Sequence, residues 1–235
     1  MAESFAPVTF SWRRIVDLFF PPRCGGCDSL GWLWCEACQA SVCYLSPPTC
    51  VRCSKPGVHS DVCADCRASP PTIDSIRCMA VFDGRIRRAI HTFKYRRVAA
   101  LGEPLGDALA RFWLQSPQPA RLIVPVPLHP RRQRERGYNQ AELLARRIAR
   151  AAGLPVRPAA LRRVRATAVQ MTLTAAERQA NVAGAFQGDA AVVRGADVLL
   201  IDDVCTTGAT LDACATALKA AGAAAVYGLT LARPL

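Results

Sequence analysis

The feature that most constrains the fold is residues 198–210, where an apolar run passes directly into two carboxylates and a loop rich in Thr and Gly. Residues 198–201 show no polar alternation, which is typical of a strand buried on both faces in a parallel sheet. Asp202 and Asp203 follow at the carboxyl end of that strand. Open α/β sheets bind ligands at this edge. The chain is therefore expected to contain a parallel α/β sheet with a binding site beside these acids.

The loop after the two acids has the composition of a phosphate-binding site. Its hydroxyls and small residues leave backbone N–H groups accessible just before a predicted helix, and both the N–H groups and the helix dipole favour an anion. The two carboxylates can accept hydrogen bonds from sugar hydroxyls, so the combination suits a ribose 5-phosphate. The predicted site consists of Asp202, Asp203, Thr206, Thr207, Gly208, Ala209 and Thr210.

Other protein classes with similar motifs fit less well. A receiver domain carries its acid pair near its start, whereas only 32 residues follow Asp203 here. A Walker loop ends in Gly-Lys-Ser/Thr, and a dinucleotide fingerprint needs Gly-x-Gly-x-x-Gly; neither pattern fits this stretch. An incidental Asp pair at a strand end would leave the Thr-Thr-Gly-Ala-Thr run unexplained.

Four Cys-x-x-Cys pairs lie in the first third of the chain. This spacing lets a tight turn aim both sulfurs at one tetrahedral ion, and two pairs complete a four-cysteine zinc site. Seven residues separate the first two pairs, nine the last two, and eleven the halves, so we group neighbouring pairs, although other groupings stay open. A redox role would call for an adjoining βαβ pattern. Two structural zinc ions are predicted, with the ligands Cys24, Cys27, Cys35, Cys38, Cys50, Cys53, Cys63 and Cys66.

Length and composition set the outline of the molecule. The 235 residues suffice for one α/β domain and a small satellite, and 51% apolar with 20% charged residues argues against wholesale disorder. No stretch approaches the roughly 20 apolar residues of a membrane helix. The short apolar run 15–20 is interrupted by Asp17, which is unlike a secretory signal. We expect a cytoplasmic protein without membrane insertion, divided into a Cys-rich double zinc module at 20–70 and an α/β domain at 71–235.

The middle of the chain is predicted to form further parts of an α/β sheet. Periodicity predicts strands at 78–82 and 122–126 and helices at 85–95 and 98–115. Because proline is tolerated only near a helix start, a start of the second helix at Pro104 stays open. An Arg-rich loop at 127–137 follows the second strand. Asn139 is expected to cap the next helix, with Glu142 completing a capping box.

The motifs together resemble known families. Residues 198–210 resemble the phosphoribosyl-diphosphate (PRPP) signature of type I phosphoribosyltransferases. Residues 124–130, residues 134–140 and the cysteine module together resemble the ComF family of competence-associated proteins, over about 24–233. The resemblance implies a type I phosphoribosyltransferase-like fold, a twisted parallel sheet with flanking helices, and PRPP with Mg2+ as the ligand.

The resemblance also implies two further loops at the site. The loop after the strand at 122–126 would hold the diphosphate, with candidates Pro127, Leu128, His129, Arg131, Arg132 and Arg136. A mobile loop would contain Arg163, Thr167, Gln170 and Arg178. No individual catalytic residue is assigned. Recognition of an acceptor in this fold needs a hood, which would have to come from the N-terminal third, and the zinc knuckles there give no sign of a base pocket; this counts against an active transferase.

Three functions remain open at this point. The chain could be a working phosphoribosyltransferase, a PRPP or nucleotide sensor without turnover, or, as the family resemblance implies, a protein that handles imported single-stranded DNA with other DNA-uptake proteins. Charge bears on the third, because 13 Arg and 3 acids between 121 and 178 give +10 of the total +12. A diphosphate needs few of these cations, which leaves a surplus for a DNA backbone. On this basis Arg146, Arg147 and Arg150 are predicted to reach solvent as part of a DNA-binding face, with Tyr138 as a stacking surface; the alternative is a solvated Arg-rich surface.

Overall fold

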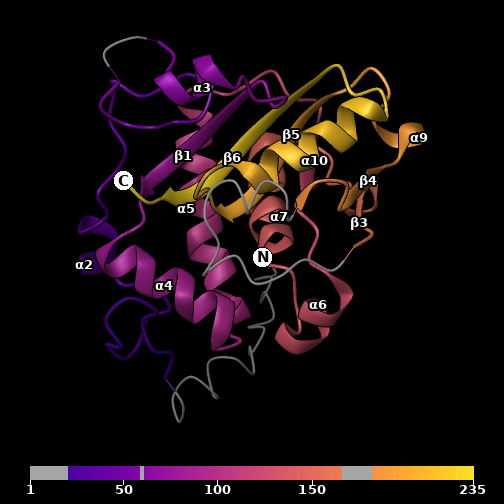
Figure 1. Ribbon diagram of the computed structural model, residues 1–235. Coiled ribbons are helices and arrows are strands. Elements are labelled where there is room, and N and C mark those ends of the chain that lie inside the picture. The colour runs from indigo at the N-terminus through magenta and orange to yellow at the C-terminus, as the bar shows by residue number, and fades with distance from the viewer. Residues whose placement is uncertain (1–20, 59–60, 166–181) are drawn as a thin grey trace, which may run out of the picture.

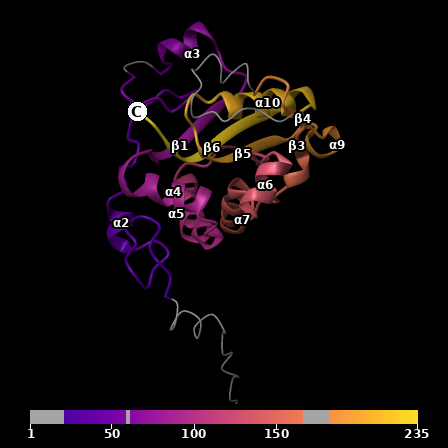
Figure 2. The same cartoon turned by 60° about the horizontal axis from the view of Figure 1, so that its bottom comes forward.

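The computed structural model describes residues 21–58, 61–165 and 182–235, and its centre is a four-stranded parallel sheet in the order β1-β6-β5-β2. The strands are β1 (Ser75–Val81), β2 (Leu122–Pro125), β5 (Asp197–Val204) and β6 (Ala225–Arg233). Helices cover both faces of this sheet (Figures 1 and 2). The predicted fold class, a phosphoribosyltransferase-like parallel sheet with flanking helices, is confirmed.

The sheet separates two hydrophobic cores. Alternate residues of β5 supply them: Leu199 and Ile201 face the first core, while Val198 and Leu200 face the second, and all four are fully buried. This burial on both faces explains why the strand shows no polar alternation in sequence. The strand continues through both acids, because Asp202 pairs with Thr230 of β6.

Helices α4 (Gly84–Tyr95), α5 (Gly102–Leu114) and α7 (Gln140–Ala152) pack on the first core, and α10 (Ala209–Ala220) packs on the second. The helix predicted at 98–115 is divided, since a 3-10 turn, η1 (Ala99–Leu101), precedes α5. Pro104 lies in the first turn of α5, where its missing N–H costs no helical hydrogen bond. Asn139 caps α7 as predicted by accepting a hydrogen bond from Ala141 N, whereas Glu142 pairs with Arg146 instead of completing the capping box.

The Arg-rich segment at 127–137 is not wholly a loop, which corrects the sequence prediction. It contains α6 (Pro130–Arg136), which begins with Pro at its first position and ends at Gly137 in a left-handed conformation with φ 85°. His129 caps this helix, because its side chain accepts a hydrogen bond from Arg131 N. A proline at the start and a glycine at the end are standard helix boundaries that the sequence displays.

The cysteine-rich segment forms two similar ribbons. In each, a Cys-x-x-Cys turn is followed by a residue with positive φ (Asp28 at 65° and Ser54 at 58°), and a short helix carries the last ligand. These helices are α2 (Glu36–Ala40) and α3 (Ala64–Ala68). The same backbone hydrogen bonds recur, from the first cysteine N–H to the carbonyl oxygen five residues later, in both ribbons. The segment therefore contains an internal structural repeat.

The two ribbons attach to the sheet at its β1 edge. Between them, residues 43–45 run antiparallel to β1: Leu45 N donates to Met79 O at 3.0 Å, and Val81 N donates to Cys43 O at 2.8 Å. The first ribbon packs on α4 and η1, and in the second Ser54 Oγ donates to Ile76 O at 2.7 Å. The cysteine module therefore covers an edge that a parallel sheet would otherwise expose.

A small antiparallel pair lies beside the main sheet. It consists of β3 (Leu161–Arg163) and β4 (Phe186–Gly188), preceded by η2 (Pro158–Ala160) and followed by α9 (Ala190–Val193). Among the helices of the described residues, none has the length and apolar character needed to cross a bilayer. The short N-terminal segment 15–20 considered above lies outside the described residues.

Candidate functional site

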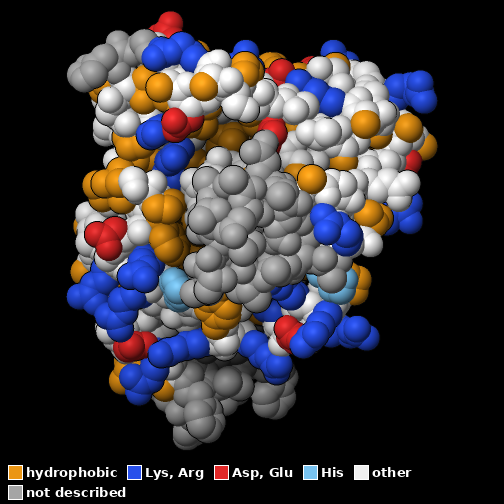
Figure 3. Space-filling view, viewed as in Figure 1, with side chains coloured by type: hydrophobic (Ala, Val, Ile, Leu, Met, Phe, Trp, Pro, Cys, Tyr) orange, Lys and Arg blue, Asp and Glu red, His pale blue; other side chains and the backbone are white. Residues whose placement is uncertain are grey.

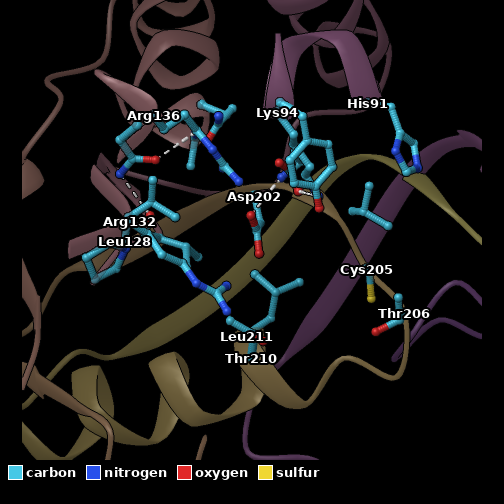
Figure 4. Close-up of a pocket in the computed structure, with 18 of the residues that line it drawn as sticks. His91, Lys94, Leu128, Arg132, Arg136, Asp202, Cys205, Thr206, Thr210 and Leu211 are labelled. Carbon is cyan, nitrogen blue, oxygen red and sulfur yellow. Dashed lines mark hydrogen bonds and ion pairs between the residues drawn. The ribbon is translucent and has the colours of Figure 1, made fainter. Parts of the chain in front are cut away.

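A cleft of about 660 Å³ opens at the carboxyl ends of β5 and β2, between α4, α6 and the first turn of α10. Figure 4 shows Asp202 near its middle, with Leu128, Arg132 and Arg136 on one side and His91 and Thr206 on the other. The residues of the predicted site that line it are Asp202, Asp203, Thr206, Gly208, Ala209, Thr210, Pro127, Leu128, Arg132, Arg136 and Arg163. The structure thus brings together residues that lie up to 83 positions apart in sequence, from Pro127 to Thr210.

The two acids have different environments. Asp203 is 9% exposed at its side chain and forms an ion pair with Lys94, whose Nζ lies 2.7 Å from Asp203 Oδ1. Asp202 is half-buried, and its Oδ1 accepts a hydrogen bond from Asp203 N at 2.8 Å. Burial, reinforced by the negative charge of Asp203, raises the pKa of Asp202 to about 7. Asp203 is therefore paired with a counter-ion, while Asp202 is poised to change protonation near neutral pH.

Lys94 itself stays charged. Burial acts to lower its pKa, but the attraction of Asp203 outweighs burial, so the pKa of Lys94 lies above its ordinary value. The ion pair thus neutralises one of two adjacent carboxylates, which reduces the repulsion between them.

The loop between β5 and α10 forms the floor of the cleft. Gly208 occupies the position before α10 with φ 86°, a backbone conformation that a side chain would strain. A Cβ at Gly208 would also approach Ile76 Cδ1 to 3.3 Å. Thr207 does not line the cleft; its Oγ1 accepts a hydrogen bond from Ala209 N at 3.3 Å, which orders the turn. The arrangement places the amino end of a 12-residue helix next to the acids.

Only some of the predicted diphosphate residues line the cleft, because the helix α6 directs the others elsewhere. Pro127, Leu128, Arg132 and Arg136 line the cleft, but His129 is the cap of α6 and Arg131 pairs with Glu135 at 2.9 Å. Helical geometry explains this split, since Arg132 and Arg136 are four positions apart and share one face. Of these candidates, Arg132 and Arg136 therefore supply the cationic side chains that line the cleft.

Only part of the predicted mobile loop can be placed. Arg163, at the end of β3, lines the cleft, and burial lowers its pKa. Its guanidinium lies 5.3 Å from the centroid of the Phe186 ring. Thr167, Gln170 and Arg178 lie outside the described residues.

Sequence reasoning missed the contribution of α4. His91, Lys94 and Tyr95 all line the cleft, together with Phe82 at the end of β1. Two signals were present: the spacing i, i+3, i+4 places these three residues on one helix face, and Lys94 is one of only 3 Lys beside 27 Arg.

The cysteines form two four-sulfur clusters with the predicted grouping. Within each cluster all ligand atoms lie within 4.8 Å of one another. Three of the sulfur pairs are 3.6 to 3.8 Å apart. Zn–S bonds of about 2.3 Å in a tetrahedron require sulfurs about 3.8 Å apart, so both clusters fit zinc. Cys78, Cys205 and Cys214 are buried outside these clusters, and Cys43 is exposed.

The predicted DNA face on α7 needs correction. Arg147 is 24% exposed at its side chain, and its guanidinium makes two bonds of 2.7 Å to the Asp107 carboxylate of α5. It also contacts Glu103 at 3.1 Å. Arg147 therefore joins two helices and does not reach out to solvent, although Arg146 and Arg150 are exposed. Tyr138, the predicted stacking surface, is half-buried and its hydroxyl donates to Phe93 O.

Comparison with known proteins agrees with this architecture. Residues 15–80 match the model of the double zinc ribbon domain, and residues 138–234 match that of the phosphoribosyl transferase domain. The chain is 32% identical over 210 residues to the DNA utilization protein YhgH of Escherichia coli, covering 87% of this chain and 92% of that protein. It is 30% identical to competence protein F of Haemophilus influenzae, covering 85% and 90%, and 28% identical to competence protein ComFC of Bacillus subtilis, covering 85% and 83%. Among solved structures, a glutamine PRPP amidotransferase from B. subtilis superimposes with a TM-score of 0.39 and 24% identity, over 57% of this chain and 26% of that one.

The sheet, the cleft at its carboxyl edge and the two cysteine clusters define a phosphoribosyltransferase-type α/β protein that carries a double zinc ribbon. Within that class, the similarity to the relatives named above determines the family. The chain belongs to the ComF family.

Proposed function

We propose that the cleft binds PRPP. The observation that carries this proposal is the position of Asp202 between two different anion-binding elements, the amino end of α10 and the Arg132–Arg136 face of α6. A 5-phosphate suits the first, because backbone N–H groups and the helix dipole favour it, and a diphosphate suits the second. The ribose hydroxyls then face the acids.

Mg2+ fits this arrangement, although the two acids offer it few oxygen ligands. Asp203 is already paired with Lys94, so Asp202 is the carboxylate of the pair that is left to a cation. Mg2+ is commonly bound by one or two carboxylates together with substrate phosphates and water. We infer that Asp202 would hold Mg2+ together with the bound ligand, and that the ion would neutralise the charge of the leaving diphosphate.

Calorimetric titration of PRPP with and without Mg2+ tests the proposal. The parent should bind PRPP more tightly with Mg2+, and the variant Asp202→Asn, Asp203→Asn should lose binding. A matched control is Asp189→Asn, because Asp189 caps α9 away from the cleft. Unchanged affinity in the double variant would overturn the proposal. Release of diphosphate from bound PRPP when bases, amines or DNA are offered as acceptors separates a transferase from the alternative, a sensor without turnover.

We propose further that the protein acts in the handling of imported single-stranded DNA, in the cytoplasm and with other DNA-uptake proteins. The relatives named for competence and DNA utilization support this role. The charge distribution supports it as well. Residues 84–97, which span α4 and the turn after it, contain six cations and no acid.

Exposed cations of α4, of the turn after it and of α6 lie on the side of the molecule where these helices flank the cleft, and two of them, Arg88 and Arg96, line a neighbouring hollow with Asp28. Figure 3 shows Lys and Arg side chains gathered along the lower part of the face where α4 and α6 lie. We call the exposed set the basic rim: Arg85, Arg87, Arg88, Arg96, Arg97, Arg131 and Arg134. Arg88 and Arg96 lie 3.4 and 3.9 Å from the same carboxylate, Asp28, so two cations share one acid and a net positive charge remains. The rim, and not the outer face of α7, is our proposed DNA surface.

A further inference from the structure

Helix α6 is held against α4 by polar contacts at its carboxyl end. None of its seven residues is buried, so apolar packing contributes little to its position. Arg97, in the turn after α4, donates to Glu135 O from Nε at 3.1 Å and from Nη2 at 2.7 Å. Directly after α6, the Tyr138 hydroxyl donates to Phe93 O of α4. The residue between these two contacts is Arg136, whose backbone is therefore fixed relative to α4.

The Arg136 side chain is held from two directions. Its guanidinium lies 5.7 Å from the centroid of the Tyr95 ring of α4, and its Nη1 donates to Oε1 of Gln140 at the start of α7. Arg136 is half-buried and lines the cleft on the same side of Asp202 as Arg132 (Figure 4). A long side chain that is already ordered costs less to immobilise when a ligand binds. The contacts of Arg136 therefore prepare it for a ligand in the cleft.

The side-chain amide of Gln140 suits this position because it can both accept and donate. Gln140 is 1% exposed, and a glutamine is seldom buried unless its polar atoms are paired. A guanidinium has only donors and a carbonyl only accepts, so the amide oxygen faces Arg136 and the amide nitrogen donates to Phe93 O at 3.5 Å. A glutamate would place a charge against that carbonyl, and a methionine would pair with neither group. Gln140 thus connects Arg136 to the end of α4.

We propose that Gln140 and Tyr95 are positioning residues, which fix the guanidinium of Arg136 for the diphosphate of PRPP. The inference rests on the proposed function, because it assumes that the α6 side of the cleft receives the diphosphate. Arginine binds phosphoryl oxygens through a planar fork of N–H donors, so the direction of the fork matters. The contact of Nη1 with Gln140 and the packing of the guanidinium on Tyr95 set that direction. The preference of the cleft for PRPP over ribose 5-phosphate, which lacks the diphosphate, then depends on two residues that act through Arg136.

Three ligands distinguish this inference from the proposed function: PRPP with Mg2+, inorganic diphosphate with Mg2+, and ribose 5-phosphate. By calorimetry and NMR titration, Gln140→Met should bind the first two about tenfold more weakly than the parent and ribose 5-phosphate within about twofold. Gln118→Met is the matched control, because Gln118 Oε1 accepts a hydrogen bond from Trp113 Nε1 at 2.9 Å and Gln118 does not line the cleft. If the parent does not bind PRPP, the proposed function fails and this inference with it. If the parent binds PRPP and Gln140→Met binds it equally tightly, the inference alone is overturned.

A second background separates positioning from a general structural role. If Gln140 acts through Arg136, then adding Gln140→Met to Arg136→Met should cause no further loss of affinity for diphosphate, which Arg132 still attracts. The same loss in both backgrounds would show that Gln140 does not act through Arg136. An equal loss of affinity for ribose 5-phosphate would show that Gln140 supports the fold of the cleft as a whole. Either result would overturn the positioning role.

Tyr95 allows an independent test at the surface. Tyr95→Leu removes the ring beneath Arg136 and should weaken the binding of diphosphate about threefold, whereas Tyr95→Phe keeps a ring and should bind diphosphate as the parent does. Tyr95 ends α4 and is 59% exposed, so neither change opens the core. Trp32→Leu is the matched control, because Trp32 is 63% exposed and does not line the cleft. Equal affinity for diphosphate in the parent and Tyr95→Leu would overturn the role of Tyr95.

Discussion

Lys94 Nζ lies 2.7 Å from Asp203 Oδ1, so a helix on one face of the sheet is tied by an ion pair to the carboxyl end of the central strand. The carboxylate is 9% exposed and the lysine 21% exposed at their side chains. The pair is thus largely buried. Removing one partner of a buried ion pair leaves the other charge without compensation. The ion pair also neutralises one of the two adjacent carboxylates, Asp202 and Asp203.

Replacing Lys94 with Met should destabilise the protein by about 3 kcal/mol, because Asp203 would remain buried without its counter-ion beside Asp202. The double variant Lys94→Met, Asp203→Asn should recover most of that loss, since it removes both charges. Urea unfolding of the parent, both single variants and the double variant measures the coupling. If the effects of the two single changes simply add, the ion pair contributes nothing and this interpretation is wrong.

Asp202 should make stability and ligand binding depend on pH near neutrality. Its pKa in the folded protein, about 7, lies above the ordinary carboxyl value, so folding favours the protonated form. The stability from this group is present at pH values below its unfolded pKa and is lost as pH rises through about 7. Asp202→Asn should therefore gain in Tm relative to the parent between pH 6 and 8.

The affinity for the ligand should depend on pH in the opposite direction to the stability. Mg2+ and ribose hydroxyls both prefer the ionised carboxylate, so the affinity for PRPP with Mg2+ should rise between pH 6 and 8 in the parent. Calorimetry over this range checks it, with Asp189→Asn as the control. A Tm difference between the parent and Asp202→Asn that stays constant across the range would show that Asp202 does not titrate there.

Each zinc ribbon should hold its metal independently, because the two four-sulfur clusters share no ligand. The parent should contain two zinc ions per chain, and Cys24→Ser with Cys27→Ser should contain one by elemental analysis. Cys43→Ser is the matched control, since Cys43 belongs to neither cluster. Loss of both ions in the first variant would show that the ribbons fold as one unit.

The same variant tests the division into a zinc module at 20–70 and a phosphoribosyltransferase-like domain at 71–235, which we propose. Gly25 packs against Leu101 and Ala89, so α4 and η1 should lose amide protection in hydrogen exchange when the first ribbon unfolds. The buried strand β5 should keep its protection. Loss of protection throughout β5 would mean that the sheet depends on the ribbon.

The sequence was most informative where one short segment determines the geometry. Spacing alone grouped the cysteines correctly, because a Cys-x-x-Cys turn is a local structure. The apolar run at 198–201 likewise predicted a buried strand with acids at its end. Local signals also existed for α6, with Pro130 at its start and Gly137 at its end, but the density of Arg favoured a loop.

Features that depend on packing between distant segments could not be predicted in this way. The pattern of α7 showed that Arg147 is off the apolar face, but not that Asp107 and Glu103 of α5 face it. The approach of Lys94 to Asp203 spans 109 positions and depends on how α4 crosses the end of the sheet. Periodicity identifies which face of a helix is polar, while the tertiary fold decides what that face meets.

The basic rim provides the last prediction. If it binds single-stranded DNA, the change Arg88→Gln, Arg96→Gln, Arg134→Gln should weaken binding of an oligothymidine and make the slope of log affinity against log salt shallower by about 0.7 for each phosphate that the variant no longer neutralises. All three side chains are exposed, so the fold should be retained. Fluorescence anisotropy over a series of salt concentrations measures both quantities.

The matched control is Arg111→Gln, Arg121→Gln, Arg157→Gln, which removes the same charge from three exposed positions outside the rim: Arg111 lies in the last turn of α5, Arg121 precedes β2, and Arg157 N donates to Ile123 O of β2. Because net charge acts at long range, both triple variants should bind DNA somewhat more weakly at low salt, but only the rim variant should neutralise fewer phosphates and therefore show a shallower slope. Equal slopes in the two variants would show that the basic charge attracts DNA without a defined surface. A parent protein whose DNA binding does not respond to salt would show that the cations of the rim do not bind the DNA backbone.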